Sequence, residues 1–402
     1  MPVDLDNNYF QRINKMLQEH DRAIPFLLID LDRLDQNIEL LQKSIVNKMD
    51  YRIVVKSLPS LPLIDYIIKK TGTHKLMVFH QPFLSAIAQH YGEEIDVLLG
   101  KPMPIKTAKY FYENIAGYSK GFDPYCQVQW LVDTTERIDQ YVAMAKLLGK
   151  KIRLNLEIDV GLHRGGFQSI QDLRKALHLL IANSDRVLLS GFMGYDPHVV
   201  KLPTMVRSQS KASQMANDFY DQCKAILKDE FPALWSEHLT FNGAGSPTIN
   251  LHFESETPLN DISAGSCLVK PSTFDIPSLE GYLPSAFIAT PVLKKFEGTL
   301  IPGIERFKSI LSLASVKNKR SYFIYGGFWK AEYCFPKGLS QNLIFSASTN
   351  QTMVNVGPDT DLDVDDFVFL RPHQSEFVFL QFGKILAVKN FEIVEKWDIL
   401  SN

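Results

Sequence analysis

Apolar positions follow two different rhythms between residue 50 and about residue 270. Short β-branched and apolar runs alternate with longer segments in which apolar residues recur at helical spacing. The short runs predict buried strands and the longer segments predict amphipathic helices, so the alternation is typical of repeated βα units around a parallel sheet. We predict eight strands, at residues 52–56, 76–80, 96–99, 127–132, 152–159, 188–195, 239–242 and 261–264.

Candidate helices separate these strands, and they cover residues 61–70, 82–91, 106–115, 135–148, 170–182 and 209–228. Eight βα units are the number that closes a TIM-type (β/α)₈ barrel. The main alternative is an open doubly wound sheet, for which a GxGxxG fingerprint is expected after the first strand. Because the sequence after residue 56 lacks that fingerprint, we favour the barrel.

The pattern changes after about residue 270, where strand-like runs are separated by turn residues. These runs predict a mainly-β domain, with strands at residues 286–292, 321–325, 367–370, 377–382 and 385–388. Residues 25–42 predict a strand and a helix before the first barrel strand, so the chain in one interpretation begins in the β domain. We divide the chain into an N-terminal segment (1–25), a barrel (26–270) and a β domain (271–402).

Composition narrows the range of partners and compartments. A formal net charge of −2 over 402 residues gives no electrostatic reason to expect nucleic acid or an anionic membrane as a partner. The four cysteines are scattered without a CxxC pair, which is typical of a reducing compartment. The first residues lack an apolar targeting segment, and no apolar run approaches bilayer length. We expect a cytoplasmic protein that acts on a small molecule.

Candidate chemistry begins with Lys56, which follows the first barrel strand in the stretch RIVVKS. The carboxyl ends of barrel strands and the loops after them build the active site. Desolvation among apolar neighbours lowers the pKa of a lysine, and such an amine forms Schiff bases near neutral pH. The alternative is that Lys56 reaches solvent or pairs with a carboxylate.

Polar side chains also follow the fifth and sixth strands, in the stretches NLEIDVGLHRGG and GYDPH. The glycines there allow a backbone to approach a ligand closely. A surface ion-pair cluster on a tight turn is the alternative for the first stretch, and ordinary loop residues for the second. The polar side chains are Glu157, Asp159, His163, Arg164, Tyr195 and His198.

The seventh strand is followed by FNGAGSPT and the eighth by AGS. Backbone N–H groups and the hydroxyls of Ser246 and Thr248 in the first loop are suited to cradle a phosphate, and barrels often bind phosphate at these two loops. An ordinary tight turn is the alternative. A phosphate cradle opposite Lys56, with Arg164 on a strand between them, points to pyridoxal phosphate held by Lys56 as an internal aldimine.

These motifs together resemble those of the alanine-racemase-like (fold type III) pyridoxal-phosphate enzymes, most closely the D-threonine aldolase and D-serine dehydratase branch. The likeness covers nearly the whole chain and rests on VVKS, EIDVGLHRGG, GFMGYDPH, FNGAGSPT and DISAGSCL in this order. It implies a barrel with a β domain, a homodimer, an amino-acid substrate and Lys56 as the residue that carries the cofactor.

The resemblance also implies the roles of other residues. Arg164 would lie at the pyridine ring, where a guanidinium does not readily give up its proton, and Tyr195 would lie near ring and substrate. We assign catalysis to Lys56, Tyr195 and His198. The cofactor-binding set is Lys56, His163, Arg164, Tyr195, Gly243, Gly245, Ser246, Gly265 and Ser266.

The sequence departs from this branch at two positions. The branch carries a metal pair, His-x-Cys or His-x-Asp, in the β domain, and the corresponding stretch here is PHQSE, with His373 followed by Ser375 and Glu376. A neutral hydroxyl is a poor Zn²⁺ ligand, so His373 is the one candidate ligand and a divalent metal is doubtful. Cys267 also stands where a tyrosine is expected.

Three functions remain open on these residues. The leading interpretation is an aldolase or dehydratase that acts at Cα and Cβ of a D-amino acid. A racemase is the alternative enzyme, because it needs two bases but no metal, and Lys56 with His198 or Tyr195 would supply them. A non-catalytic pyridoxal-phosphate carrier is the third, although a carrier needs only a barrel and has no use for a second domain.

Overall fold

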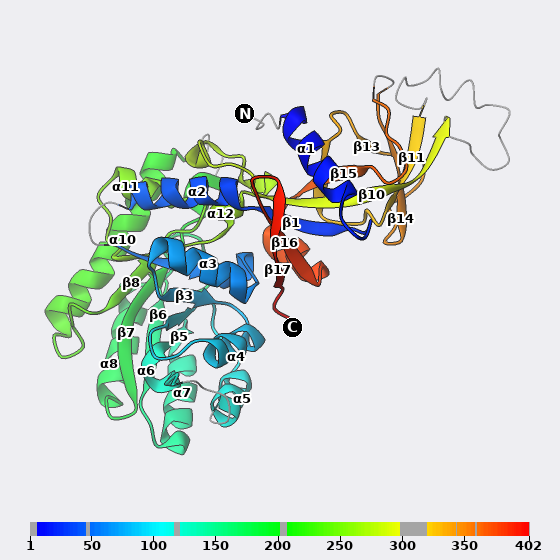
Figure 1. Cartoon of the computed structure of the whole chain (residues 1–402). Helices are drawn as coiled ribbons and strands as arrows, with labels where there is room; N and C mark the ends of the chain where they lie inside the picture. The colour runs from blue at the N-terminus through cyan, green and yellow to red at the C-terminus, as the bar shows by residue number, and fades with distance from the viewer. Residues whose placement is uncertain are drawn as a thin grey trace. The chain divides into compact units, whose positions relative to one another are not determined.

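The computed structural model describes residues 6–45, 49–115, 121–201, 207–297, 320–342, 344–357 and 360–401. These residues form two compact units. One unit runs from Ile38 to Cys267 and also takes Pro277–Glu280 and the residues from Leu400 onward. The other combines the described residues up to Asn37 with Leu268–Ile276 and those between Gly281 and Ile399. Figure 1 shows the chain by residue number.

The first unit is a closed barrel of eight parallel strands that pair in chain order, with the last strand pairing with the first. The predicted TIM-type barrel is therefore confirmed. Its strands are β2 (Asp50–Val54), β3 (Lys75–Val78), β4 (Asp96–Leu99), β5 (Val128–Val132), β6 (Ile152–Glu157), β7 (Val187–Gly194), β8 (Thr240–Gly243) and β9 (Asp261–Ala264).

Helices lie between the barrel strands and around them (Figure 1). Standard caps bound several of them: Thr134 and Ser169 accept hydrogen bonds from the first turns of α7 and α8, and Gly149 ends α7 in the left-handed conformation. The helices are α3 (Leu61–Thr71), α4 (Gln81–His90), α5 (Ile105–Ile115), α6 (Pro124–Gln127), α7 (Thr135–Leu148), α8 (Ile170–Ala182), α9 (His198–Lys201), α10 (Gln209–Glu230) and α11 (Leu251–Glu254).

The interior of the barrel contains a buried ion-pair network centred on Arg52 of β2. Its guanidinium, which has no exposed surface, binds both carboxylate oxygens of Asp261 on β9, at 3.0 and 2.9 Å, and Asp96 on β4 at 2.8 Å. Burial alone would raise the pKa of Asp96, but Arg52 and Arg153 lower it to about 2. The network therefore joins the first, third and last strands of the barrel.

The second unit is built on a nine-stranded sheet. Its strands are β1 (Phe26–Asp30), β10 (Ala286–Glu297), β11 (Arg320–Tyr325), β12 (Ala331–Phe335), β13 (Ser340–Gln341), β14 (Gln351–Asn355), β15 (Phe367–Pro372), β16 (Lys384–Lys389) and β17 (Glu392–Asp398). The remaining helices are α1 (Asn7–Gln18), α2 (Leu31–Ser44), α12 (Ser266–Val269) and α14 (Ser375–Val378), with short 3₁₀ turns at Val55–Ser57, Ser272–Phe274, Pro277–Leu279 and Phe379–Gln381.

The N-terminal residues belong to this sheet unit rather than to the barrel. Strand β1 pairs antiparallel with β10 and parallel with β16, and all five of its residues are buried. Helix α1 packs on the sheet through Tyr9, Phe10, Ile13 and Leu17. Our barrel boundary at residue 26 thus differs from the observed division, because β1 finds its partners in the β sheet and α2 runs from one unit into the other.

Two local predictions differ from the structure. Residues 377–382 form helix α14 and a 3₁₀ turn instead of a strand, since the run is too short for its apolar pattern to distinguish the two. The strand predicted at residues 52–56 ends at Val54, and Lys56 lies in the following 3₁₀ turn. The other seven barrel strands lie where the pattern predicts them, with ends that move by up to two residues.

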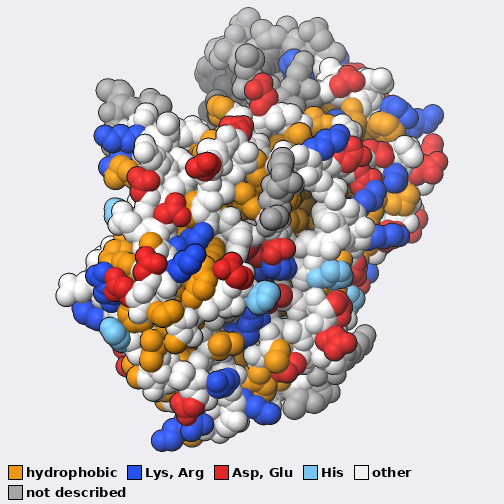
Figure 2. All heavy atoms as spheres, turned by 90° about the vertical axis from the view of Figure 1, so that its left-hand side faces the viewer, with side chains coloured by type: hydrophobic (Ala, Val, Ile, Leu, Met, Phe, Trp, Pro, Cys, Tyr) orange, Lys and Arg blue, Asp and Glu red, His pale blue; other side chains and the backbone are white. Residues whose placement is uncertain are grey.

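One face of the molecule shows how its charged side chains are distributed. Figure 2 shows one face of the molecule, on which acidic and basic side chains are interspersed with apolar ones. Such mixing produces no strong single-sign field on that face. Within the described ranges, no helix combines the length and the apolar character that crossing a bilayer requires.

The Arg52 network generates a stability prediction. Replacing Arg52 by Met leaves the carboxylates of Asp261 and Asp96 without their buried cation, which is expected to lower the free energy of unfolding by about 3–5 kcal/mol. Urea denaturation followed by circular dichroism measures this change. The control is Arg174→Ala, which breaks an exposed pair with Glu230 and should leave the unfolding midpoint nearly unchanged. Equal midpoints for both variants would contradict the prediction.

Candidate active site

Lys56 lies one short turn beyond β2, at the carboxyl-terminal end of the barrel. Its side chain is half-buried, and Nζ lies 4.5 Å from the centroid of the Phe79 ring, just after β3. A cation this close to an aromatic face is attracted to it, so Phe79 helps to hold the amine in place. The neighbouring Ser57 is buried and receives a hydrogen bond from Ser266 Oγ at 2.9 Å. The end of β2 is thereby joined to the end of β9.

The glycine-rich loop after β8 is fastened to this same region. Ser246 Oγ accepts hydrogen bonds from the backbone N–H groups of Gly265 at 3.3 Å and Cys267 at 3.0 Å. The hydroxyl proton of Ser246 therefore remains available as a donor. The hydrogen bonds among the described residues include none from the backbone N–H of Gly245 or of Ser246. Three donors in one loop are thus available to an anion.

Two of the glycines are required by close packing. A Cβ at Gly265 would lie 2.8 Å from the carbonyl oxygen of Val54, so β9 can approach the end of β2 only without a side chain there. A Cβ at Gly245 would lie 2.6 Å from Cε2 of Tyr195. Tyr195, which follows β7, therefore packs directly against the loop. Gly243 is buried at the end of β8, and Ser266 begins α12.

The loop after β6 is closed by Asp159. Its Oδ1 accepts from the backbone N–H of Gly161 at 3.0 Å and of His163 at 2.8 Å, and Oδ2 lies 2.9 Å from His163 Nδ1. Burial alone would raise the pKa of Asp159, but these hydrogen bonds lower it. The His163 side chain is 80% exposed and, with φ +56°, turns the chain toward Arg164. The contacts of His163 thus lie within its own loop.

Arg164 and Tyr195 meet at the mouth of the barrel. Cζ of Arg164 lies 5.2 Å from the centroid of the Tyr195 ring, and the arginine is otherwise exposed. Together with the Tyr195–Gly245 packing, this contact connects the β6 loop to the glycine-rich loop. The structure therefore brings together Lys56, Arg164, Tyr195, Gly245, Ser246, Gly265 and Ser266 through a continuous series of contacts at one end of the barrel.

Glu157, the last residue of β6, carries the most perturbed carboxyl group at this end. Burial, followed by the charge of Asp133, raises the pKa of Glu157 to about 7, and Arg164 opposes the rise. Asp133 directly follows β5, and the pairing of Val132 with Leu156 sets it beside Glu157. Sequence reasoning missed Asp133, although the rule that strand ends carry the site, applied to β5, would have found it.

His198 is buried at the start of α9, with 8% of its surface exposed. Burial lowers the pKa of its imidazole below the ordinary value, although the charges of Asp196 and Asp159 act in the opposite direction. Among the described residues, its Nδ1 has no hydrogen-bond partner. His198 is therefore a neutral imidazole at neutral pH, with one buried ring nitrogen that the described residues leave without a partner.

The hydroxyl of Thr248 is used differently from what the sequence predicts. It donates a hydrogen bond of 2.7 Å to Oδ1 of the buried Asp196, so its single proton is already used within the protein. Of the two hydroxyls in this loop, only that of Ser246 keeps its proton for a phosphate.

His373 lies in the β-sheet unit, at the end of β15. Its Nδ1 is 2.6 Å from Ser272 Oγ, whereas Ser375 is fully buried with Oγ 3.5 Å from Glu376 Oε2. Across the described ranges, no group of three or more His, Cys, Asp or Glu side chains is placed to hold a metal ion. The stretch PHQSE therefore presents one imidazole, a neutral hydroxyl at the position of the second ligand, and the Glu376 carboxylate one residue further along.

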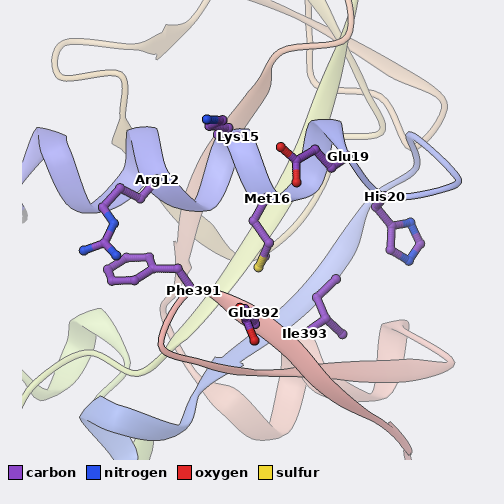
Figure 3. A pocket seen from close by; sticks show the side chains of 8 residues that line it. All are labelled: Arg12, Lys15, Met16, Glu19, His20, Phe391, Glu392 and Ile393. Atoms are coloured by element: carbon purple, nitrogen blue, oxygen red, sulfur yellow. The ribbon is translucent and has the colours of Figure 1, made fainter.

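Two surface cavities lie away from these residues. One, of about 620 Å³, is on the sheet unit between α1 and the β16–β17 turn; Figure 3 shows Arg12 stacked on Phe391 at its edge, 3.5 Å from the ring centroid. The other, of about 480 Å³, lies at the amino-terminal end of the barrel beside Cys126 and Arg153. Neither contains any of the predicted site residues.

Solved structures of several known enzymes are similar to this one. The structure is similar to that of D-threonine aldolase from Filomicrobium marinum (TM-score 0.72, 14% identity, covering 94% of this chain and 97% of that one). It is also similar to D-threo-3-hydroxyaspartate dehydratase from Delftia sp. HT23 (TM-score 0.71, 14% identity, 96% and 99% covered). A third similar structure is alanine racemase from Bacillus anthracis with bound L-Ala-P (TM-score 0.68, 14% identity, 94% and 98% covered).

No curated protein sequence matches the chain. The family described as "Alanine racemase, N-terminal domain" matches residues 29–272, a span that contains Lys56, Arg164, Tyr195 and the glycine-rich loop. The match and the similar structures together confirm the resemblance that the five motifs indicate. Because the matched span exceeds half of the chain, this protein belongs to the alanine racemase N-terminal domain family.

Proposed function

We propose that this protein is a pyridoxal-phosphate-dependent enzyme that acts at Cα and Cβ of a D-amino acid, as an aldolase or dehydratase. One observation carries the proposal: the amine of Lys56 and the donors of the Ser246 loop are joined at one end of the barrel by the Ser57–Ser266 hydrogen bond. Pyridoxal phosphate has an aldehyde, which reacts with an amine, and a phosphate, which needs hydrogen-bond donors. A site for it therefore requires both.

The residues present fit the cofactor. The loop offers the Ser246 hydroxyl and the N–H groups of Gly245 and Ser246, and phosphates bind to such sets of donors. Gly245 and Gly265 have no Cβ to collide with Tyr195 and Val54, so the two loops can pack closely against the ends of β7 and β2. Gly243 and Ser266 shape the two ends of the cradle, and we assign them to it on that ground.

Pyridoxal phosphate, when bound, supplies an aldehyde for amines and an electron-withdrawing ring next to Cα. Lys56 provides the amine that holds the cofactor and later takes or returns a proton as a base. Arg164 would donate a hydrogen bond to the ring nitrogen, since a guanidinium is a donor and not a readily available acid. Tyr195 would contact one side of the ring. Glu157, with a pKa of about 7, is protonated in about half of the molecules at neutral pH.

A racemase is the second candidate, and His198 is the observation in its favour. Racemisation needs a second base to complement Lys56. The buried imidazole of His198 is neutral, and its Nδ1 lacks a partner within the described chain, so it can accept a proton. Product analysis separates the two candidates, since a racemase returns the intact enantiomer whereas an aldolase or dehydratase breaks a bond at Cβ. For either function we expect a homodimer, as the resemblance implies, and a cytoplasmic location, as the scattered cysteines indicate.

The role of Lys56 predicts a specific covalent label. With pyridoxal phosphate added, the protein should develop a visible absorption band, and borohydride reduction should attach a pyridoxyl group to Lys56, as located by peptide mapping. Lys56→Arg should abolish the label, and the control Lys70→Arg, at the end of α3, should retain it. A label on another lysine, or no band in the wild-type protein, would refute the assignment.

The raised pKa of Glu157 predicts a pH dependence of stability. Because the folded state binds this proton more tightly than the unfolded chain does, the contribution is fully present below about pH 4.5 and is lost as pH rises through about 7. Urea denaturation over this range should show the wild-type protein losing stability relative to Glu157→Gln. Glu136→Gln, an exposed change on α7, should follow the wild-type profile. Parallel profiles for all three proteins would count against a proton-holding Glu157.

The ligand set around His373 predicts activity without a metal. Ser375 offers only a neutral hydroxyl, and His373 Nδ1 is hydrogen-bonded to Ser272, so a tight zinc site is not expected there. The purified protein should contain no stoichiometric zinc, and turnover of D-amino acids should survive a chelator. Metal analysis that finds one tightly held ion per chain, lost in His373→Ala, would contradict this and indicate a metal-assisted reaction.

A further inference from the structure

We propose that Asp196 is a positioning residue that holds the glycine-rich loop in the form that binds phosphate. This inference rests on the proposed cofactor function and deepens it. Asp196 follows β7 directly and is 5% exposed. The sequence motif GYDPH contains it, but none of the roles assigned above uses it.

Both carboxylate oxygens of Asp196 lie within hydrogen-bond distance of residues that follow the glycine-rich loop's Gly245 and Ser246 in the chain. Oδ1 accepts a hydrogen bond of 2.7 Å from Thr248 Oγ1, and Oδ2 lies 2.8 Å from Nε2 of His252 in α11. All three side chains are almost fully buried. Charge-assisted hydrogen bonds in such a place are strong, and loss of the carboxylate would leave two buried polar groups unpaired.

Thr248 transmits this attachment to the phosphate loop. The backbone N–H groups of Thr248 and Ile249 both donate to the carbonyl oxygen of Gly245, each at 2.9 Å. Those two bonds close the turn that contains Gly245 and Ser246. Fixing Thr248 therefore fixes the direction in which the free N–H groups of the turn point.

His252 transmits the attachment to the other end of the loop. Its Nδ1 lies 2.8 Å from Thr257 Oγ1, which also accepts from the backbone N–H of Leu259 at 3.3 Å. A Cβ at Gly243 would lie 2.8 Å from both Cδ atoms of Leu259. Asp196 is thus connected to the start of the loop through Leu259 and to its end through Thr248.

The position of Asp196 in the chain adds a third connection. Tyr195, the preceding residue, packs its ring against Gly245 at the distance where a Cβ would collide. Anchoring Asp196 therefore sets both the loop and the ring that supports it. A residue that only stabilised the fold would affect every ligand of the site alike, whereas a residue that shapes this loop affects the phosphate alone.

The test compares two ligands that differ only in the phosphate. Binding of pyridoxal phosphate and of pyridoxal, which lacks the phosphate, is measured by absorbance titration for the wild-type protein and for Asp196→Ala. We expect Asp196→Ala to bind pyridoxal phosphate at least ~10-fold more weakly while its affinity for pyridoxal stays within ~2-fold of wild type. Unchanged affinity for pyridoxal phosphate, or an equal loss for both ligands, overturns the inference.

Two further variants keep the test decisive if Asp196→Ala does not fold. Thr248→Val removes only the hydroxyl that binds Asp196, and it should show the same phosphate-selective loss; equal binding to wild type overturns the inference. Asp196→Asn keeps an acceptor for Thr248 and an amide donor for His252 in its other tautomer, so it should restore most of the affinity. Thr71→Val, which removes a hydroxyl at the end of α3, is the control and should change neither affinity.

Different results would refute the cofactor function and the role of Asp196. A wild-type protein that binds neither ligand refutes the proposed cofactor function, and this inference with it. A wild-type protein that binds pyridoxal phosphate more tightly than pyridoxal, but keeps that preference in Asp196→Ala and Thr248→Val, refutes the role of Asp196 alone.

Discussion

The buried contact between Arg52 and Asp261 joins the first and last strands of the barrel, and the site depends on that closure. The carboxylate takes the guanidinium in a bidentate arrangement, with oxygen–nitrogen distances of 3.0 and 2.9 Å. Closure brings the end of β2 beside the end of β9, where Ser57 meets Ser266 and the backbone of Gly265 passes Val54. Lys56 and the glycine-rich loop, more than 180 positions apart in the chain, become neighbours for this reason.

Polar residues at the barrel mouth divide into two groups by their hydrogen bonds. Asp159, Asp196 and Thr248 use their polar atoms on the protein itself, and they shape the loops after β6 and β8. Ser246 keeps its hydroxyl proton, and His198 keeps Nδ1 unpaired within the described chain. Since a buried polar group without a partner is costly, atoms left in this state are the places where a ligand is expected.

Much of the fold and part of the site follow from the sequence because they depend on local patterns. Strand and helix periodicities identified all eight barrel strands, and the strand-end rule pointed to Lys56, Arg164, Tyr195 and Ser246. The pattern failed at residues 377–382, where a short apolar run fits a helix as well as a strand. It also left β1 open between the barrel and the β domain, because an apolar run does not state which sheet supplies its partners.

The sequence by itself determined the order of elements, the barrel and the set of residues at its carboxyl end, since these depend on the spacing of side chains along one chain. Only the tertiary structure decided how each of those residues is used. It directed the hydroxyl of Thr248 to Asp196 as a hydrogen-bond donor. It also placed Asp133 beside Glu157, so that burial and a neighbouring charge raise the pKa of Glu157 to about 7. Hydrogen-bond partners and desolvation depend on distances between strands, and spacing along the sequence does not contain those distances.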